Sequence, residues 1–135
     1  LTESLSRAKE VDAAVVLHTE SGTPEVMADL SRIADKAHFP KSRLVKHYGG
    51  PEALENPNGI VVSLISSSTN IESSSGSEFM LETDYLDDPK RPGAVMGPKT
   101  VPRKTQKALE SNVLSKSQVH KIHTELPDSV YREFR

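Results

Sequence analysis

The chain has no cysteine and few aromatic residues, and both absences exclude kinds of site. Without cysteine there is no disulfide and no thiolate metal site, so any metal must be held by histidine, carboxylate or water. Aromatic residues make up only 4% of the chain, so binding through base stacking is not indicated. The net charge of −2 gives no overall basic field of the kind that holds long nucleic acids, although local basic patches remain open.

Long apolar runs are absent as well. No stretch reaches the length of about 18 residues that spans a bilayer, and there is no signal-peptide pattern. With 35% hydrophobic and 27% charged residues over 135 positions, we expect a soluble, cytoplasmic protein of one domain or less. The first residue is Leu1 and residues 1–10 read as the latter part of a helix, so we also expect a fragment of a longer protein.

Short apolar runs alternate with helical patterns along the chain. A helix is predicted from Thr23 and Pro24, with Thr23 as N-cap and Pro24 at the first helical position. This alternation favours a parallel sheet with right-handed crossovers, either half of an eight-stranded barrel or a small open sheet. The four predicted strands are residues 13–17, 43–46, 59–65 and 78–81.

The remaining segments are predicted from their composition. The Ser-rich residues 66–76 are read as a linker, a loop or a short helix between two strands. Residues 87–103 hold four prolines and are predicted to form a long irregular loop. The rest is predicted as helical, with a helix over residues 115–125 and a last turn beginning at Pro127.

Three potential metal ligands follow predicted strands. His18, His47 and Asp84 each lie at or just beyond the carboxyl end of an apolar run, the position of the active site in α/β barrels. The separations are 29 and 37 residues, and one βα unit is roughly 30 residues, so the two histidines should lie on adjacent strands. Two imidazoles and a carboxylate suit zinc or another divalent metal, which would activate a bound water. A carboxylate beside that water could take its proton.

Each of these residues also has an ordinary explanation. A histidine after a strand is often a loop residue bonded to backbone or solvent, and Asp84 alone could cap a helix or form a turn. The coincidence of all three at strand ends favours a shared site. Of the other histidines, His38 is predicted to cap a helix terminus, and His120 and His123 to lie on a helix surface.

Four stretches resemble one family. They are VVLHTES at residues 15–21, VKHYGGP at 45–51, ETDYLDDPKRPGAVMGPKTVPRK at 82–104 and VHKIHTELPDSVY at 119–131. Together they resemble the archaeal branch of the TatD-like metal-dependent hydrolases, within the amidohydrolase superfamily of TIM-barrel folds. The resemblance covers most of the chain, and the segment 82–104 is its most specific part.

The resemblance implies a role for each ligand. His18 matches the metal-binding histidine of the family's fifth strand, His47 that of the sixth, and Asp84 the aspartate of the eighth, which binds metal and orients or deprotonates the attacking water. The family's His-x-His pair on the first strand and carboxylate on the fourth are missing. The resemblance therefore identifies residues 1–135 as the C-terminal half of a TIM-barrel domain, strands 5 to 8. Glu82 is expected to be structural.

Basic residues near the same face suggest an anionic substrate. Lys46, Arg91, Lys99 and Arg103 lie in or near the loops of the expected active face and could bind a phosphodiester. A solvated basic loop is the alternative. Asp87 and Asp88, before Pro89, are expected to shape the loop.

Three readings stay open. The first is a metal-dependent hydrolase, for example a TatD-related deoxyribonuclease. The expected metal is zinc, as one or two ions, with magnesium or manganese as alternatives. The second is a non-catalytic half-barrel that binds or scaffolds and has lost the first-strand ligands. The third is a small open α/β domain with a coincidental set of His and Asp. A half barrel has two raw sheet edges, so its expected partner is the missing N-terminal half or a second copy of the chain.

Overall fold

Four short parallel strands form one sheet in the computed structural model, which describes residues 1–85, 90 and 96–132. The strands pair in chain order, with Val16 beside Val45, Val45 beside Val61, and Leu64 beside Leu81. All four carboxyl ends therefore lie at one edge of the sheet. The strands are β1 (Val15–Leu17), β2 (Leu44–Lys46), β3 (Val61–Ile65) and β4 (Met80–Glu82).

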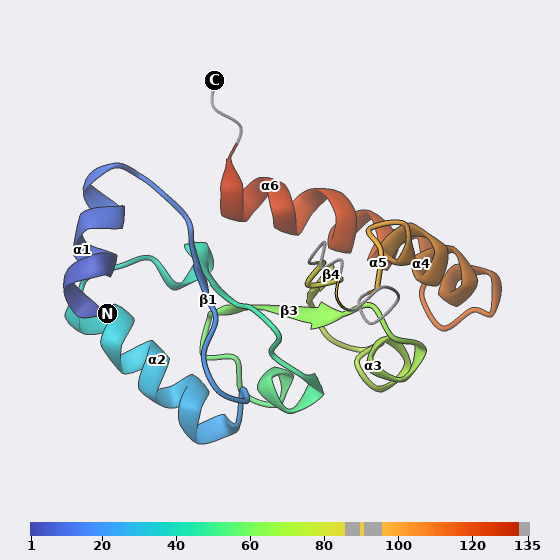
Figure 1. Cartoon of the computed structure of the whole chain (residues 1–135), viewed down its shortest axis with the longest axis horizontal. Coiled ribbons are helices and arrows are strands. Elements are labelled where there is room, and N and C mark those ends of the chain that lie inside the picture. Colours follow the sequence, from blue (N-terminus) through green and yellow to red (C-terminus); the bar gives the residue numbers. More distant parts are fainter. Residues whose placement is uncertain (86–89, 91–95, 133–135) are drawn as a thin grey trace.

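The described helices lie on both sides of this sheet (Figure 1). They are α1 (Thr2–Glu10), α2 (Pro24–Lys36), α3 (Ser68–Ser73), α4 (Thr100–Glu110), α5 (Lys116–His120) and α6 (Leu126–Tyr131). Two short 3₁₀ helices, η1 (Lys41–Arg43) and η2 (Pro51–Leu54), flank β2. A π-helical turn, η3 (Lys121–Glu125), joins α5 to α6. No helix among the described residues is long and apolar enough to cross a membrane.

The predicted helix after β1 is confirmed with its start signal. The Thr23 hydroxyl accepts a hydrogen bond from the Val26 amide at 3.4 Å, and Pro24 is the first helical residue, where no amide donor is needed. The helix buries Leu30 against the sheet in the larger apolar cluster. This helix carries the chain from the carboxyl end of β1 back to the start of β2.

Three predictions about element bounds need correction. Residues 100–103 are the first turn of α4, not loop, because Pro102 lies near the helix start, where a missing amide donor is tolerated. Pro127 does not begin a separate turn, because the helix runs on from α5 through η3 into α6. A proline ring crowds the carbonyl four residues earlier, and the wider π turn relieves that crowding. The strands are shorter than or offset from the predicted runs.

The Ser-rich segment takes one of its predicted alternatives. It contains the short helix α3, and the Ser67 side chain caps it by accepting a hydrogen bond from the Asn70 amide at 3.0 Å. A serine-rich composition therefore supplies a helix cap here.

The two faces of the sheet carry separate apolar clusters. Leu44 and Val62 belong to the larger cluster, which includes Leu5 of α1 and Leu30 of α2. Their neighbours point to the other face, because side chains alternate along a strand. There a smaller cluster joins Val45, Met80 and Val130, so α6 covers the face opposite α1 and α2 (Figure 1).

These findings confirm an α/β fold with a parallel sheet in sequential order. Membership of a larger barrel stays a prediction, because the described strands are the same in an open sheet and in half of a closed one.

Candidate metal centre

The predicted site residues lie together at the carboxyl edge of the sheet. His47 directly follows β2, and its amide donates to the carbonyl of Leu17, the last residue of β1, at 3.0 Å. This bond holds the start of the loop against the end of the neighbouring strand. His18, which directly follows β1, lies with its ring centre 5.0 Å from that of His47. The prediction that the two histidines follow adjacent strands is confirmed.

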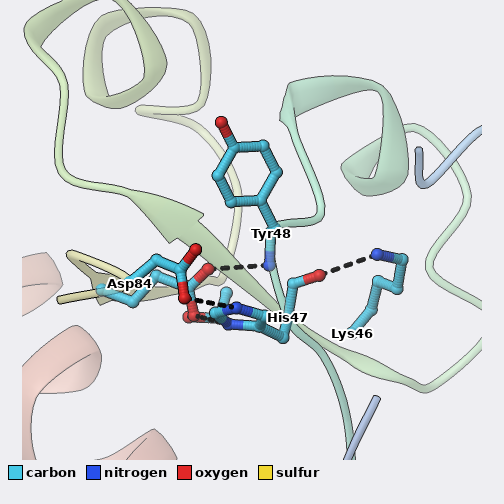
Figure 2. Close-up of polar contacts among 6 residues, drawn as sticks. Lys46, His47, Tyr48 and Asp84 are labelled. Atoms are coloured by element: carbon cyan, nitrogen blue, oxygen red, sulfur yellow. Dashed lines mark hydrogen bonds and ion pairs between the residues drawn. The ribbon is translucent and has the colours of Figure 1, made fainter. Parts of the chain in front are cut away.

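Asp84 reaches the same histidine from the end of β4. Its Oδ1 lies 3.3 Å from Nε2 of His47, and its side chain is half exposed (Figure 2). Asp84 has a φ of +47°, in the left-handed region that aspartate tolerates better than most residues. This backbone turn after β4 aims the carboxylate back at the sheet edge.

Glu82 holds the other side of the His47 ring. Its Oε2 lies 2.6 Å from His47 Nδ1 and accepts from the Ser63 hydroxyl at 2.6 Å, while its Oε1 accepts from the Tyr48 amide at 2.7 Å. Both the His47 and the Glu82 side chains are only 16% exposed, so these bonds are largely shielded from water. The expectation that Glu82 is merely structural is therefore incomplete: its carboxylate is part of the site.

The sequence analysis took Glu82 as structural because it matches none of the metal ligands that the family resemblance implies. The available signal was its place at the carboxyl end of an apolar run, the same address as His18 and His47. Ser63 of β3 gave no signal, because one serine in a buried strand resembles any other.

The two nitrogens of His47 face two carboxylates. If Nδ1 carries the hydrogen that Glu82 accepts, the Nε2 of a neutral ring points its lone pair at the Asp84 oxygen 3.3 Å away. Two acceptors face each other at this distance only with a proton or a cation between them. The arrangement therefore calls for positive charge between His47 and Asp84.

A metal fits this pair in donor type and spacing. Zinc bonds of about 2.0–2.2 Å in tetrahedral geometry place two ligand atoms about 3.4 Å apart, close to the Nε2–Oδ1 separation. Two imidazoles on one such zinc have ring centres about 5 Å apart, close to that of His18 and His47. Even so, within the described residues no three His, Asp or Glu side chains converge closely enough to hold a metal together. The pair fits as part of a ligand set rather than as a complete one.

Lys46 lies in a different place from the one its sequence position suggested. Its side chain is fully buried, and its Nζ donates to the His47 carbonyl at 2.7 Å (Figure 2). Burial lowers the pKa of this amine, partly offset by the negative charges of Glu82 and Glu20. The buried Lys46 amine therefore stabilises the backbone at His47, and it is not exposed for contact with a substrate.

The other predicted substrate-binding residues lie apart from this cluster or outside the described residues. Lys99 and Arg103 are exposed at the start of α4, and within the described residues neither contacts the His47 group. Arg91, Asp87 and Asp88 lie outside the described residues. His120 is exposed on the helix surface as predicted, whereas His123 is exposed only in part, because its ring packs against the buried Thr105 hydroxyl at 2.9 Å. The His38 amide donates to the Asp35 carbonyl at the end of α2.

A cavity of about 360 Å³ opens beside the cluster. It is lined by the loops that follow β1 and β2, including Ser21, Tyr48 and Gly50, and by Asn70 of α3. Tyr48 belongs to both features, since its amide binds Glu82 and its side chain is 56% exposed. The cavity gives a small substrate room next to the candidate ligands.

The fold and this cluster define a parallel α/β protein with a histidine–carboxylate site at the carboxyl edge of its sheet. A family model described as TatD related DNase matches residues 1–132. The chain belongs to this family, as its motifs predicted. Membership indicates metal-dependent hydrolase or nuclease chemistry at the level of the family.

Comparison with one curated relative gives the share of that protein's length that the chain matches. It is an uncharacterized protein from Methanocaldococcus jannaschii, 39% identical over 126 residues, and the match covers 92% of this chain. The match covers 45% of that relative, so the chain spans about half its length. No solved structure matches.

Proposed function

We propose that this chain forms part of a metal-dependent hydrolase whose nucleophile is a metal-activated water. The observation that carries the proposal is the His47–Asp84 pair. Its facing acceptor atoms lie 3.3 Å apart at the carboxyl edge of a parallel sheet, with the His18 ring beside it. A cation shared by the two residues would satisfy acceptors that face each other, and a proton held between them is the alternative.

Each residue has a distinct role in this proposal. In the intact protein His18 and His47 would hold the metal through ring nitrogens and Asp84 through its carboxylate, which requires a closer approach than the three described side chains make here. A divalent metal bound there lowers the pKa of a coordinated water toward neutrality. Asp84 is half exposed, so it can also accept the proton that this water loses. Zinc suits the nitrogen and oxygen donors best, with magnesium and manganese as alternatives and one or two ions as the expected number.

The proposed substrate is a phosphodiester, which would make the protein a TatD-related deoxyribonuclease. Support comes from the family description and from the exposed Lys99 and Arg103 at the start of α4. Arginine and lysine bind phosphate oxygens through charge-assisted hydrogen bonds. Lys46 is not part of this proposal, because its side chain is buried.

The proposal concerns the whole protein of which this chain supplies the C-terminal half of a TIM barrel. The described ligands do not form a complete set, and the relative is about twice as long as the matched segment. We propose that the missing ligands come from a preceding half-barrel or from a second copy of the chain. The same partner would cover the sheet edges, and the cytoplasm remains the predicted location.

The decisive test is Asp84→Asn in the intact protein. Asparagine keeps the side-chain size but loses the charge that binds the metal and takes the proton, so hydrolysis should fall by at least about 100-fold, within the range for loss of a general base. The circular dichroism spectrum should not change. Exposed Asp29 on α2 is a matched control, and Asp29→Asn should keep full activity. A chelator should abolish activity and zinc should restore it. An Asp84→Asn enzyme of normal rate would rule out this assignment.

A non-catalytic half-barrel is the second candidate. The observation in its favour is that no three described ligands converge on one point. It predicts no bound divalent metal in the purified intact protein by elemental analysis, and no hydrolysis when metal is added. One metal or more per chain would favour the hydrolase.

A further inference from the structure

Glu82 joins three elements through one carboxylate. It stands at the end of β4, and its two oxygens receive hydrogens from Ser63 of β3 and from the Tyr48 amide after β2, in addition to the His47 ring. β2 and β4 are not neighbours in the sheet, because β3 lies between them. The carboxylate therefore crosses one strand to reach the loop that carries His47.

The donors around Glu82 decide which nitrogen of His47 holds the hydrogen. Ser63 and the Tyr48 amide both donate to Glu82, so the carboxylate acts as an acceptor, and Nδ1 of His47 at 2.6 Å must donate as well. A neutral His47 then has an unprotonated Nε2. Only this tautomer presents a lone pair on the Asp84 side.

The alternative tautomer would block the site. Without Glu82 the single hydrogen of a neutral His47 is free to move to Nε2, where the Asp84 oxygen at 3.3 Å can accept it. The ring and Asp84 would then satisfy each other and leave no pair of donor atoms for a cation. Glu82 prevents this by occupying Nδ1.

We propose that Glu82 is a positioning residue that fixes the Nδ1–H tautomer of His47 and so keeps Nε2 and Asp84 open for a metal ion. The inference rests on the proposed function for its consequence, metal affinity. Its immediate effect on the His47 ring does not depend on any metal. Carboxylates that receive the second N–H of a metal-binding histidine raise metal affinity by about 10–100-fold in other proteins.

A purely structural role is the competing explanation, because the same bonds also fasten β4 to β2 through β3. The two roles give different results. If Glu82 is only structural, its loss lowers the stability of the fold but leaves the tautomer of a folded His47 unchanged. Loss of a positioning residue moves the hydrogen from Nδ1 to Nε2 even where the fold is intact.

The experiment compares Glu82→Ala with wild type in the intact protein, using ¹⁵N-histidine labelling and long-range ¹⁵N–¹H correlation spectra. Spectra of the metal-free protein are taken in mildly alkaline solution, where imidazole is neutral, and His47→Asn identifies the His47 signals. We expect Nδ1–H in wild type and Nε2–H in Glu82→Ala. Glu55→Ala is the matched control: it removes an exposed glutamate for which the described residues give no side-chain partner, and it should keep Nδ1–H.

Zinc binding is measured on the same proteins by competition with a chromophoric chelator. Glu82→Ala should bind zinc about 10–100-fold more weakly than wild type, and Glu55→Ala should bind as wild type. If Glu82→Ala does not fold, Glu82→Gln replaces it. The glutamine keeps the side-chain volume but offers one acceptor oxygen to three donors, so it should show partial loss of Nδ1–H and weaker zinc binding.

The outcomes separate the inference from the proposed function. A shift to Nε2–H in Glu82→Ala, together with a wild-type protein that binds no zinc, would support the positioning role and refute the metal site. A folded Glu82→Ala that keeps Nδ1–H and full zinc affinity would overturn the inference and leave the proposed hydrolase standing. A shift together with weaker zinc binding supports both.

Discussion

His123 shows at the residue scale how packing selects a protonation state. The Thr105 hydroxyl donates its hydrogen to the Val101 carbonyl at 2.9 Å, so it must accept from Nε2 of His123, also at 2.9 Å. Partial burial lowers the pKa of this histidine below its usual 6.5. The neutral ring is thus the form that the folded chain favours.

A pH dependence of stability follows. The folded-state pKa lies below the unfolded one, so between them the unfolded chain binds more protons and stability rises with pH. The free energy of unfolding should therefore fall as the pH is lowered through 6.5 into the mildly acidic range. His123→Gln, which can still donate to Thr105, should weaken this dependence, and exposed Thr124→Ala should leave it as in wild type. Urea unfolding at several pH values measures the slopes. Equal slopes in wild type and His123→Gln would contradict the expectation.

The turn after β2 shows at the element scale why the site loop is glycine-rich. A Cβ on Gly49 would lie 2.5 Å from Cγ1 of Val62 on β3, and one on Gly22 would lie 2.7 Å from the Gly49 carbonyl oxygen. The loops after β1 and β2 therefore pack against each other and the sheet at backbone distance. This close packing brings the segments that follow His18 and His47 to one place.

Gly49→Ala should destabilise the chain by about 1–3 kcal/mol through overpacking. The cause is steric, since Gly49 does not have a positive φ. Gly76→Ala is the control, because nothing lies within 4 Å of the added Cβ, and it should change stability little. Denaturant unfolding of both variants measures the difference. A Gly49→Ala variant as stable as wild type would contradict the expectation, because it would mean that the Val62 side chain moves away from the added methyl group without loss of stability.

At the scale of the whole molecule, the sheet has an open side at β1. Within the described residues β1 pairs only with β2, and Val16 on this strand is 51% exposed. Among the described strands, β1 thus has one edge without a partner, beside an exposed apolar side chain. Such an edge favours pairing with another strand. Across the same face, α6 covers part of the apolar surface through Val130, so the exposed region lies toward β1.

We expect the 135-residue chain on its own to associate with itself. Val16→Lys should weaken this association, because a lysine on an edge strand opposes pairing. Val11→Lys is the control, since Val11 is 75% exposed after α1 and outside the sheet. Sedimentation velocity over a range of concentrations measures the effect. A chain that stays monomeric throughout, with its sheet intact by circular dichroism, would contradict the expectation.

Patterns along the chain predicted the element types and three residues of the candidate site. Local signals are strong where a single segment carries them: the Thr23 cap, the apolar runs that become strands, and the position of His18, His47 and Asp84 at strand ends. Its motifs also predicted the family, which the family model confirms. Bounds were less certain, because Pro102 and Pro127 are tolerated inside helices at positions that only the helix register defines.

The contacts among the site residues form only in the folded chain and could not be predicted from sequence patterns. The burial of Lys46 depends on which face of β2 its neighbours cover, and the role of Glu82 depends on a carboxylate that reaches across β3 to His47. These contacts join residues 35 positions apart whose types are ordinary in isolation. Hydrogen-bond direction and burial are properties of the folded arrangement, so a pattern read along the chain predicts candidate ligands but not the residue that we propose orients them.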